Sequence, residues 1–119
     1  MHRVETINPS KKIILLHWDG SITADEVRQA NDEIEEQVRK TGVPFQLIVD
    51  TTSMKLTSKD AELAFVEQQK QFLPRISRLA VVNTSNLTKL QLRKMGEQSQ
   101  NEKENFFNNF KEAVAFLEK

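Results

Sequence analysis

Asp50 and Ser58 are the residues whose types and spacing most clearly suggest chemistry. Asp50 follows the apolar run of residues 45–49, and Ser58 stands eight residues later, where a helical pattern begins. Ligands of open α/β sheets bind at the carboxyl ends of the strands, and a loop from Asp50 to Ser58 would cross that edge. A phosphate on Ser58 would add roughly −1.5 to −2 charges at a helix N-terminus, where free amides and the helix dipole tolerate it. The stretch therefore suggests a modification site.

A structural role explains the same hydroxyl groups. Ser58 is a good N-cap residue, and Thr57 and Asp60 have the S/T-x-x-D spacing of a capping motif. Such a cap contributes about 1 kcal/mol and requires no function. Composition alone favours a capping role over a phosphorylation site at Ser58, and both roles remain open.

The helix predicted after Ser58 has apolar residues outside the stripe that faces the core. The stripe consists of four residues: Ala61, Ala64, Phe65 and Phe72. Leu63, Val66 and Leu73 lie about 120–200° away from Ala61 around the helix, and the preceding loop adds Met54 and Leu56. Either this helix is buried over a wide arc, or it presents an apolar patch to a partner.

The candidate docking residues for a protein partner come from this loop and helix. They are Thr51, Thr52, Met54, Leu56, Thr57, Lys59, Leu63 and Val66.

No cofactor, metal or catalytic site is predicted. The chain has no cysteine, and His17 has no His or Cys partner at the spacing of metal ligands. The sequence contains no G-x-S-x-G, Walker or G-x-G-x-x-G motif, and three scattered glycines cannot cradle a phosphate chain. Carboxylate pairs such as Asp25 and Glu26 are expected on the solvent face of a helix. We therefore expect a protein that is not an enzyme.

Composition limits the partners. The length of 119 residues predicts a single domain over residues 1–119. The 17 basic side chains are balanced by 17 acidic ones, so we expect no general electrostatic binding of nucleic acid. One basic cluster could bind a single anion or a phosphorylated partner: Arg75, Arg78, Lys89, Arg93 and Lys94. The chain shows no targeting signal, and its longest aliphatic run, residues 13–16, is too short to span a membrane. We expect a cytoplasmic protein.

The elements that must position Asp50 and Ser58 alternate along the chain. Strands are predicted at residues 4–7, 12–18, 45–49, 76–82 and 106–107. Helices are predicted between Thr23 and Gly42, at residues 58–72 and 86–98, and after Asn109. This alternation predicts a mostly parallel sheet with right-handed crossovers.

The three remaining helices have recognisable caps or apolar residues. Thr23 and Glu26 have capping-box spacing, in which each side chain bonds the backbone amide of the other residue. The first helix has four apolar residues on one face: Val27, Ala30, Ile34 and Val38. The helix of residues 86–98 carries Leu87, Leu90 and Met95. Asn109 and Glu112 are expected to cap the last helix, which contains Ala113, Phe116 and Leu117.

The order of elements and several segments resemble a known family. The segments are G-S-I-T-A-D-E-V (20–27), F-Q-L-I-V-D (45–50), R-L-A-V-V (78–82), L-T-K-L-Q-L (87–92) and F-K-E-A-V-A-F-L (110–117). Together they resemble the STAS-like superfamily, in its SpoIIAA-like branch of small bacterial proteins. The resemblance implies a single α/β domain with a four- to five-stranded, mostly parallel sheet, an antiparallel N-terminal edge strand and about four helices.

The resemblance also implies a role for Ser58. STAS domains that antagonise anti-sigma factors are non-enzymatic switches, which a kinase-like anti-sigma factor binds and phosphorylates on a serine. That serine opens a helix, eight residues after the strand-ending Asp, in an Asp-Ser-Ser/Thr-Gly motif. Ser58 then matches the phosphoacceptor, whereas Thr57, Lys59 and Asp60 replace the other three motif residues.

The expected function is a non-catalytic regulatory or protein-interaction module with Ser58 as candidate phosphosite. The alternative is a domain that binds a small apolar or lipid-like ligand, because the SpoIIAA-like branch is similar in fold to CRAL-TRIO lipid-binding domains. The sequence leaves the oligomeric state open, a dimer included.

Overall fold

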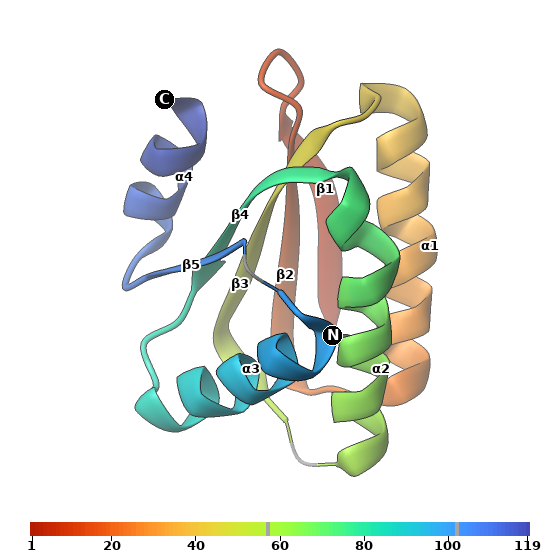
Figure 1. Cartoon of the computed structure of the whole chain (residues 1–119), viewed down its shortest axis with the longest axis vertical. Helices are drawn as coiled ribbons and strands as arrows, with labels where there is room; N and C mark the ends of the chain where they lie inside the picture. The colour runs from red at the N-terminus through yellow and green to blue at the C-terminus, as the bar shows by residue number, and fades with distance from the viewer. Residues whose placement is uncertain (57, 102) are drawn as a thin grey trace.

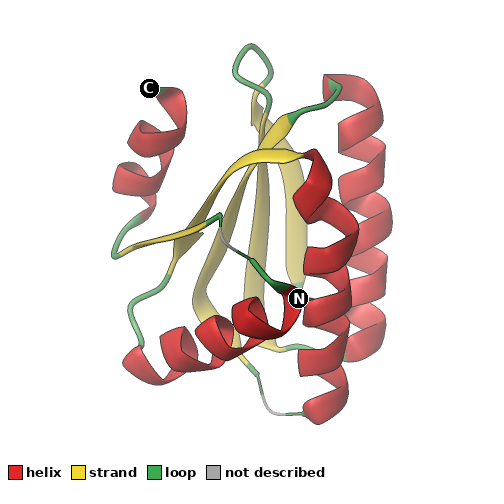
Figure 2. Ribbon diagram, in the orientation of Figure 1, coloured by secondary structure: helices red, strands yellow, loops and turns green. Residues whose placement is uncertain are grey.

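The computed structural model describes residues 1–56, 58–101 and 103–119 as one five-stranded sheet with four α-helices (Figures 1 and 2). The strands are β1 (His2–Asn8), β2 (Ile13–Ser21), β3 (Phe45–Lys55), β4 (Ile76–Val82) and β5 (Glu104–Phe107). They lie in the order β1-β2-β3-β4-β5; β1 runs antiparallel to β2, and the remaining neighbours are parallel. The predicted fold class is confirmed.

The helices divide unequally between the two faces of the sheet. They are α1 (Ala24–Thr41), α2 (Lys59–Phe72), α3 (Asn86–Ser99) and α4 (Phe110–Glu118), with a 3₁₀ turn η1 (Leu73–Arg75) after α2. In Figure 1, α1 and α2 stand side by side on the right, α3 crosses at the bottom, and α4 lies apart at the upper left. A large core joins one face of the sheet to α1, α2 and α3, and a smaller core joins the other face to α4.

The apolar run in β2 serves both cores. Ile14, Leu16 and Trp18 belong to the large core, whereas Ile13 and Leu15 belong to the small one. Successive side chains of a strand point to opposite faces, so a central strand covered on both sides must be apolar throughout. The predicted burial of this strand on both faces is confirmed.

One half of the predicted capping box at α1 is present. Thr23 Oγ1 accepts a hydrogen bond from the Glu26 amide at 3.1 Å. The Glu26 carboxylate, however, contacts His2 Nδ1 at 3.0 Å and the amino group of Met1 at 2.9 Å. The prediction that it reaches back to Thr23 is therefore wrong, because β1 lies close enough to offer charged partners.

β3 is longer than predicted. Asp50 was expected to end this strand, but β3 continues to Lys55, because Ser53, Met54 and Lys55 pair with the end of β2. The polar composition after Asp50 suggested a loop, and pairing with a distant strand overrides that local tendency. As a result, the link to α2 is much shorter than expected. Thr57 lies outside the described residues.

The apolar residues that the sequence places on α3 are buried unequally. Met95 is buried together with Leu92, but Leu87 and Leu90 are 69% and 59% exposed. α3 contacts mainly α2 and leaves the face that carries these two leucines open.

No described helix is long and apolar enough to cross a membrane.

Candidate functional site

Ser58 lies at the surface as the N-cap of α2. Its backbone is extended, and its Oγ accepts a hydrogen bond from the Ala61 amide at 3.1 Å. The predicted cap is therefore present. Ser85 and Asn109 cap α3 and α4 in the same way, so capping alone does not mark Ser58 as functional.

A hollow of about 440 Å³ distinguishes Ser58 from Ser85 and Asn109. It lies between the N-terminal ends of α1 and α2, and both N-caps, Thr23 and Ser58, line it. Arg28 is its basic residue, and Arg28 Nη1 donates to Asp25 Oδ1 at 3.0 Å. The hollow that Ser58 lines is thus also lined by the start of α1, by one guanidinium group and by the acidic residues Asp25, Asp60 and Glu67.

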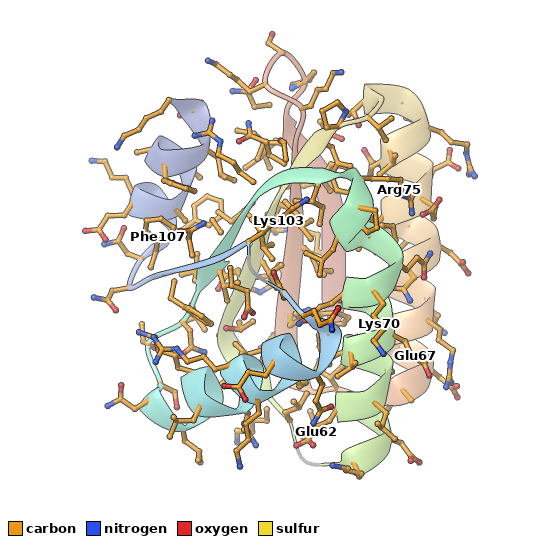
Figure 3. All side chains as sticks on the ribbon, in the orientation of Figure 1. Glu62, Glu67, Lys70, Arg75, Lys103 and Phe107 are labelled. Carbon is orange, nitrogen blue, oxygen red and sulfur yellow. The ribbon has the colours of Figure 1, made fainter. Side chains whose placement is uncertain are left out.

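The predicted docking residues divide by burial. Thr51, Met54, Leu56 and Val66 are buried, so their side chains cannot contribute to an exposed patch in this conformation. Wide burial explains the apolar residues around α2 better than a continuous patch does. Thr52, Lys59 and Leu63 are exposed, and Leu63, at 48% exposure, is their apolar member. On the same helix Glu67 and Lys70 add exposed charges (Figure 3).

Thr51 has a structural role at the carboxyl edge of the sheet. Its Oγ1 donates to the Val82 carbonyl at 2.8 Å and accepts from Asn83 Nδ2 at 2.9 Å. Asn83 Oδ1 in turn accepts from the Ser85 amide at 2.7 Å. This buried network joins β3, β4 and the start of α3, and only the tertiary structure identifies Asn83 as its centre.

Asp50 pairs with His17 across neighbouring strands. His17 Nδ1 lies 3.2 Å from Asp50 Oδ2, and Asp50 Oδ1 accepts from the Thr52 amide at 3.0 Å. Both side chains are partly exposed. The pair holds the Asp50 carboxylate in place beside β2, and the structure assigns no nucleophile to it.

The predicted basic cluster is not one patch. Arg75 forms an ion pair with Glu35, and Arg78 donates to the backbone carbonyls at the end of α4. Lys89 and Arg93 lie together, with their charged groups 5.4 and 5.5 Å from the centre of the Phe106 ring. The prediction was wrong because Arg75 in η1 faces Glu35 of α1, whereas Arg78 in β4 faces α4 on the other side of the sheet.

A second site, absent from the sequence prediction, surrounds Glu104. An open hollow of about 880 Å³ between α3 and β5 is lined by Arg93, Gly96, Glu97, Gln100, Asn101, Glu104 and Phe106. A smaller cavity of about 40 Å³ lies behind it, under α3, with mainly apolar walls. Glu104 borders both spaces. Burial raises the pKa of Glu104 to about 7, although the charge of Arg93 opposes this shift.

Sequence signals for the Glu104 site are weak. Glu104 opens a four-residue strand, and Gly96 stands inside a helix. A glycine within a helical pattern usually has a packing reason. Here a Cβ at Gly96 would overlap the Glu104 carboxyl group, so the glutamate side chain would have to move.

The comparisons with known proteins agree on the fold. A family model described as SpoIIAA-like matches residues 13–118. An uncharacterised protein of SpoIIAA-like fold from Shewanella loihica superposes with a TM-score of 0.75 at 15% identity, over 98% of this chain and 92% of that one. No curated protein sequence matches this chain.

Two solved structures of SpoIIAA are also similar. The anti-sigma factor antagonist SpoIIAA in its unphosphorylated form gives a TM-score of 0.66 at 11% identity, over 98% of this chain and 96% of that one. The Bacillus cell fate determinant SpoIIAA in its phosphorylated form gives 0.68 at 12% identity, over 98% and 99%. At these identities the similarity shows the fold.

Proposed function

Because the chain belongs to the SpoIIAA-like family, we propose that it is a non-catalytic regulatory module that docks a protein partner at the start of α2. Ser58 is the proposed point of control. The observation that carries this proposal is the position of the Ser58 hydroxyl, exposed on the wall of the hollow between the ends of α1 and α2. A kinase-like partner could reach it without unfolding any element.

A phosphate at Ser58 would change the charge of this hollow. The phosphate oxygens could still accept a hydrogen bond from the Ala61 amide, because anions are stabilised at helix N-termini. Arg28 could exchange Asp25 for the phosphate, since a charge-assisted bond to a dianion is the stronger one. The nearby carboxylates of Asp60 and Glu67 would repel it. Both effects would alter the surface that a partner meets.

The docking surface is smaller than the sequence suggested. We assign it to Thr52, Ser58, Lys59 and Leu63, which are exposed. Leu63 supplies apolar contact beside the hollow, and the charged residues around it would set specificity. We also propose that the protein acts in the cytoplasm.

Capture of a partner by tagged protein tests the docking surface. We expect Leu63→Ala and Ser58→Asp each to reduce capture of a partner identified by mass spectrometry at least tenfold. Ser85→Asp is the matched control, because Ser85 is also an exposed N-cap serine. If Ser58→Asp and Leu63→Ala capture as much partner as Ser85→Asp, the docking surface lies elsewhere.

Phosphopeptide analysis tests the control point separately. After incubation with ATP and an extract of the producing cells, we expect phosphate on Ser58 and none on Ser85. If Leu63→Ala reduces capture of the partner but no phosphate is found on Ser58, the protein is an interaction module that is not regulated at this serine.

A further inference from the structure

The edge strand β1 leaves one side of its backbone free. β1 has seven residues and lies at the end of the described sheet remote from β5 (Figure 1). Just before it, Met1 and Asp19 exchange both backbone hydrogen bonds, at 2.7 and 2.8 Å. Such pairs recur at every second residue of an antiparallel ladder. The register has no shift before Thr6, so Arg3 and Glu5 also point their N–H and C=O groups to β2.

The alternate residues of β1 point their N–H and C=O groups away from the sheet. They are His2, Val4 and Thr6, and no hydrogen bond of the described residues takes up these groups. Free groups along an edge strand form a template for another strand, which proteins usually block with proline, a bulge or a very short strand. β1 has no proline, and its register shifts only after Thr6. Its edge is therefore able to accept a further strand.

The side chains of β1 alternate between the two faces of the sheet. His2 and Thr6 are hydrogen-bonded to side chains of α1, and Val4 packs against the large core beside them. Arg3 and Glu5 therefore point to the opposite face, where their side chains are 62% and 51% exposed. On that face α4 packs over β3, β4 and β5. α1 thus anchors β1, and the two charged side chains stay at the surface.

We propose that two copies of this chain associate by antiparallel pairing of β1 with β1, about a two-fold axis at Val4. Val4 exchanges both backbone hydrogen bonds with the partner's Val4, and His2 does the same with the partner's Thr6. Arg3 lies opposite the partner's Glu5 in the non-hydrogen-bonded position, where side chains approach most closely. The two sheets become one. This surface shares no residue with the docking surface at the start of α2, so the inference goes beyond the proposed function.

The charges of β1 favour a second copy, in this register, as the occupant of the edge. Within one chain Arg3 Nε lies 3.9 Å from Glu5 Oε1, and the proposed pairing adds an opposite charge across the interface for each of them. A shift of two residues would place Arg3 opposite the partner's Arg3, or Glu5 opposite the partner's Glu5, and like charges directly opposite are destabilising. A shift of one residue would not align the free backbone groups.

Sedimentation velocity of the untagged full chain tests the pairing. We expect the sedimentation coefficient to rise toward the dimer value over roughly 10–500 μM, because an interface of one strand from each copy is small and weak. Val4→Pro should weaken this association at least tenfold and leave the monomer folded by circular dichroism, since the amide it removes faces away from β2. Val4→Thr keeps that amide and is the matched control. A parent chain that stays monomeric, or equal association of Val4→Pro and the parent, would overturn the proposal.

Charge reversal tests the register. Arg3→Glu and Glu5→Arg should each weaken self-association at least tenfold, because each places like charges opposite one another. An equimolar mixture of these two variants, and the double variant with both changes, should associate about as strongly as the parent does. Lys111→Glu, which changes the net charge equally at an exposed position of α4, is the control without an expected effect. If the mixture and the double variant remain as weak as the single variants, Arg3 does not meet the partner's Glu5 and the proposed pairing is wrong.

Discussion

Glu104 shows how one residue can link the stability of this fold to pH. A carboxyl group with a raised pKa holds its proton more tightly in the folded chain than in the unfolded chain. Since the folded pKa is about 7 and the ordinary value is 4.5, the folded chain carries more protons between these values. Its stability therefore falls as the pH rises from about 4.5 to 7 and stays lower above that range.

Replacement of this carboxyl group should remove that pH dependence. We expect Glu104→Gln to raise the free energy of unfolding at pH 8 by about 1–2 kcal/mol, allowing for solvent screening at a partly exposed group. At pH 4 the variant and the parent should be equally stable, since both are then neutral at this position. Urea unfolding at pH 4, 6 and 8 measures the difference, and a difference independent of pH would contradict the prediction.

His2 also makes the folded chain less stable as the pH rises, but through a different interaction. Burial lowers the pKa of His2, but hydrogen bonds to Glu33 and Glu26 and the charges of these residues outweigh burial and raise it above 6.5. The stabilisation it supplies is present below pH 6.5 and is lost as the pH rises through the raised value. Glu104→Gln leaves this contribution intact, so the two residues can be distinguished.

At the scale of elements, the helix starts were the most predictable feature of the chain. Thr23, Ser58 and Asn109 were each predicted as caps and each accepts a backbone amide in the structure. Such bonds span three residues and depend little on the rest of the fold, which is why spacing alone finds them. The end of β3 was not predictable in this way, because its last three residues pair with a strand about thirty positions earlier.

The two serine caps should contribute similarly to stability. Ser58→Ala and Ser85→Ala should each lower the free energy of unfolding by about 1 kcal/mol, because each removes the acceptor of one helix amide. Ser58→Asp should cost much less, since aspartate is an equally good cap. Denaturant unfolding of the three variants provides the measurement. A loss well above 1 kcal/mol for Ser58→Asp would mean that its effect on docking reflects misfolding.

At the scale of the whole molecule, the two faces of the sheet are covered unequally. Three helices and most of the large side chains pack on one face, while α4 alone covers the other through Ala113 and Leu117. Arg78 holds the end of α4 by donating to the carbonyls of Phe116 and Leu117, both at 3.0 Å. This arrangement predicts that α4 opens more easily than the helices of the large core.

Removal of the Arg78 contacts should release α4 selectively. In Arg78→Met, we expect amide hydrogen exchange within α4 to become at least tenfold faster, because four donor contacts to Gln46 and the last residues of the chain are lost. Exchange in α1 and α2 should be nearly unchanged, since the hydrogen bonds of Arg78 go to Gln46, Phe116, Leu117 and Lys119. Lys111→Met, on the exposed side of α4, is the control. Equal acceleration across all helices would show that the fold opens as one unit.

The sequence alone was sufficient for the alternation of strands and helices, the apolar stripes of α1 and α2, three helix caps and the position of Ser58. These features depend on periodicity and on contacts within one or two turns. Only the tertiary structure decided the length of β3, the burial of Thr51, Met54, Leu56 and Val66, and the exposure of Leu87 and Leu90. It alone placed Glu104 beside Gly96 and Asn101. Burial and long-range pairing arise from how distant segments pack, and local residue patterns contain little information about that packing.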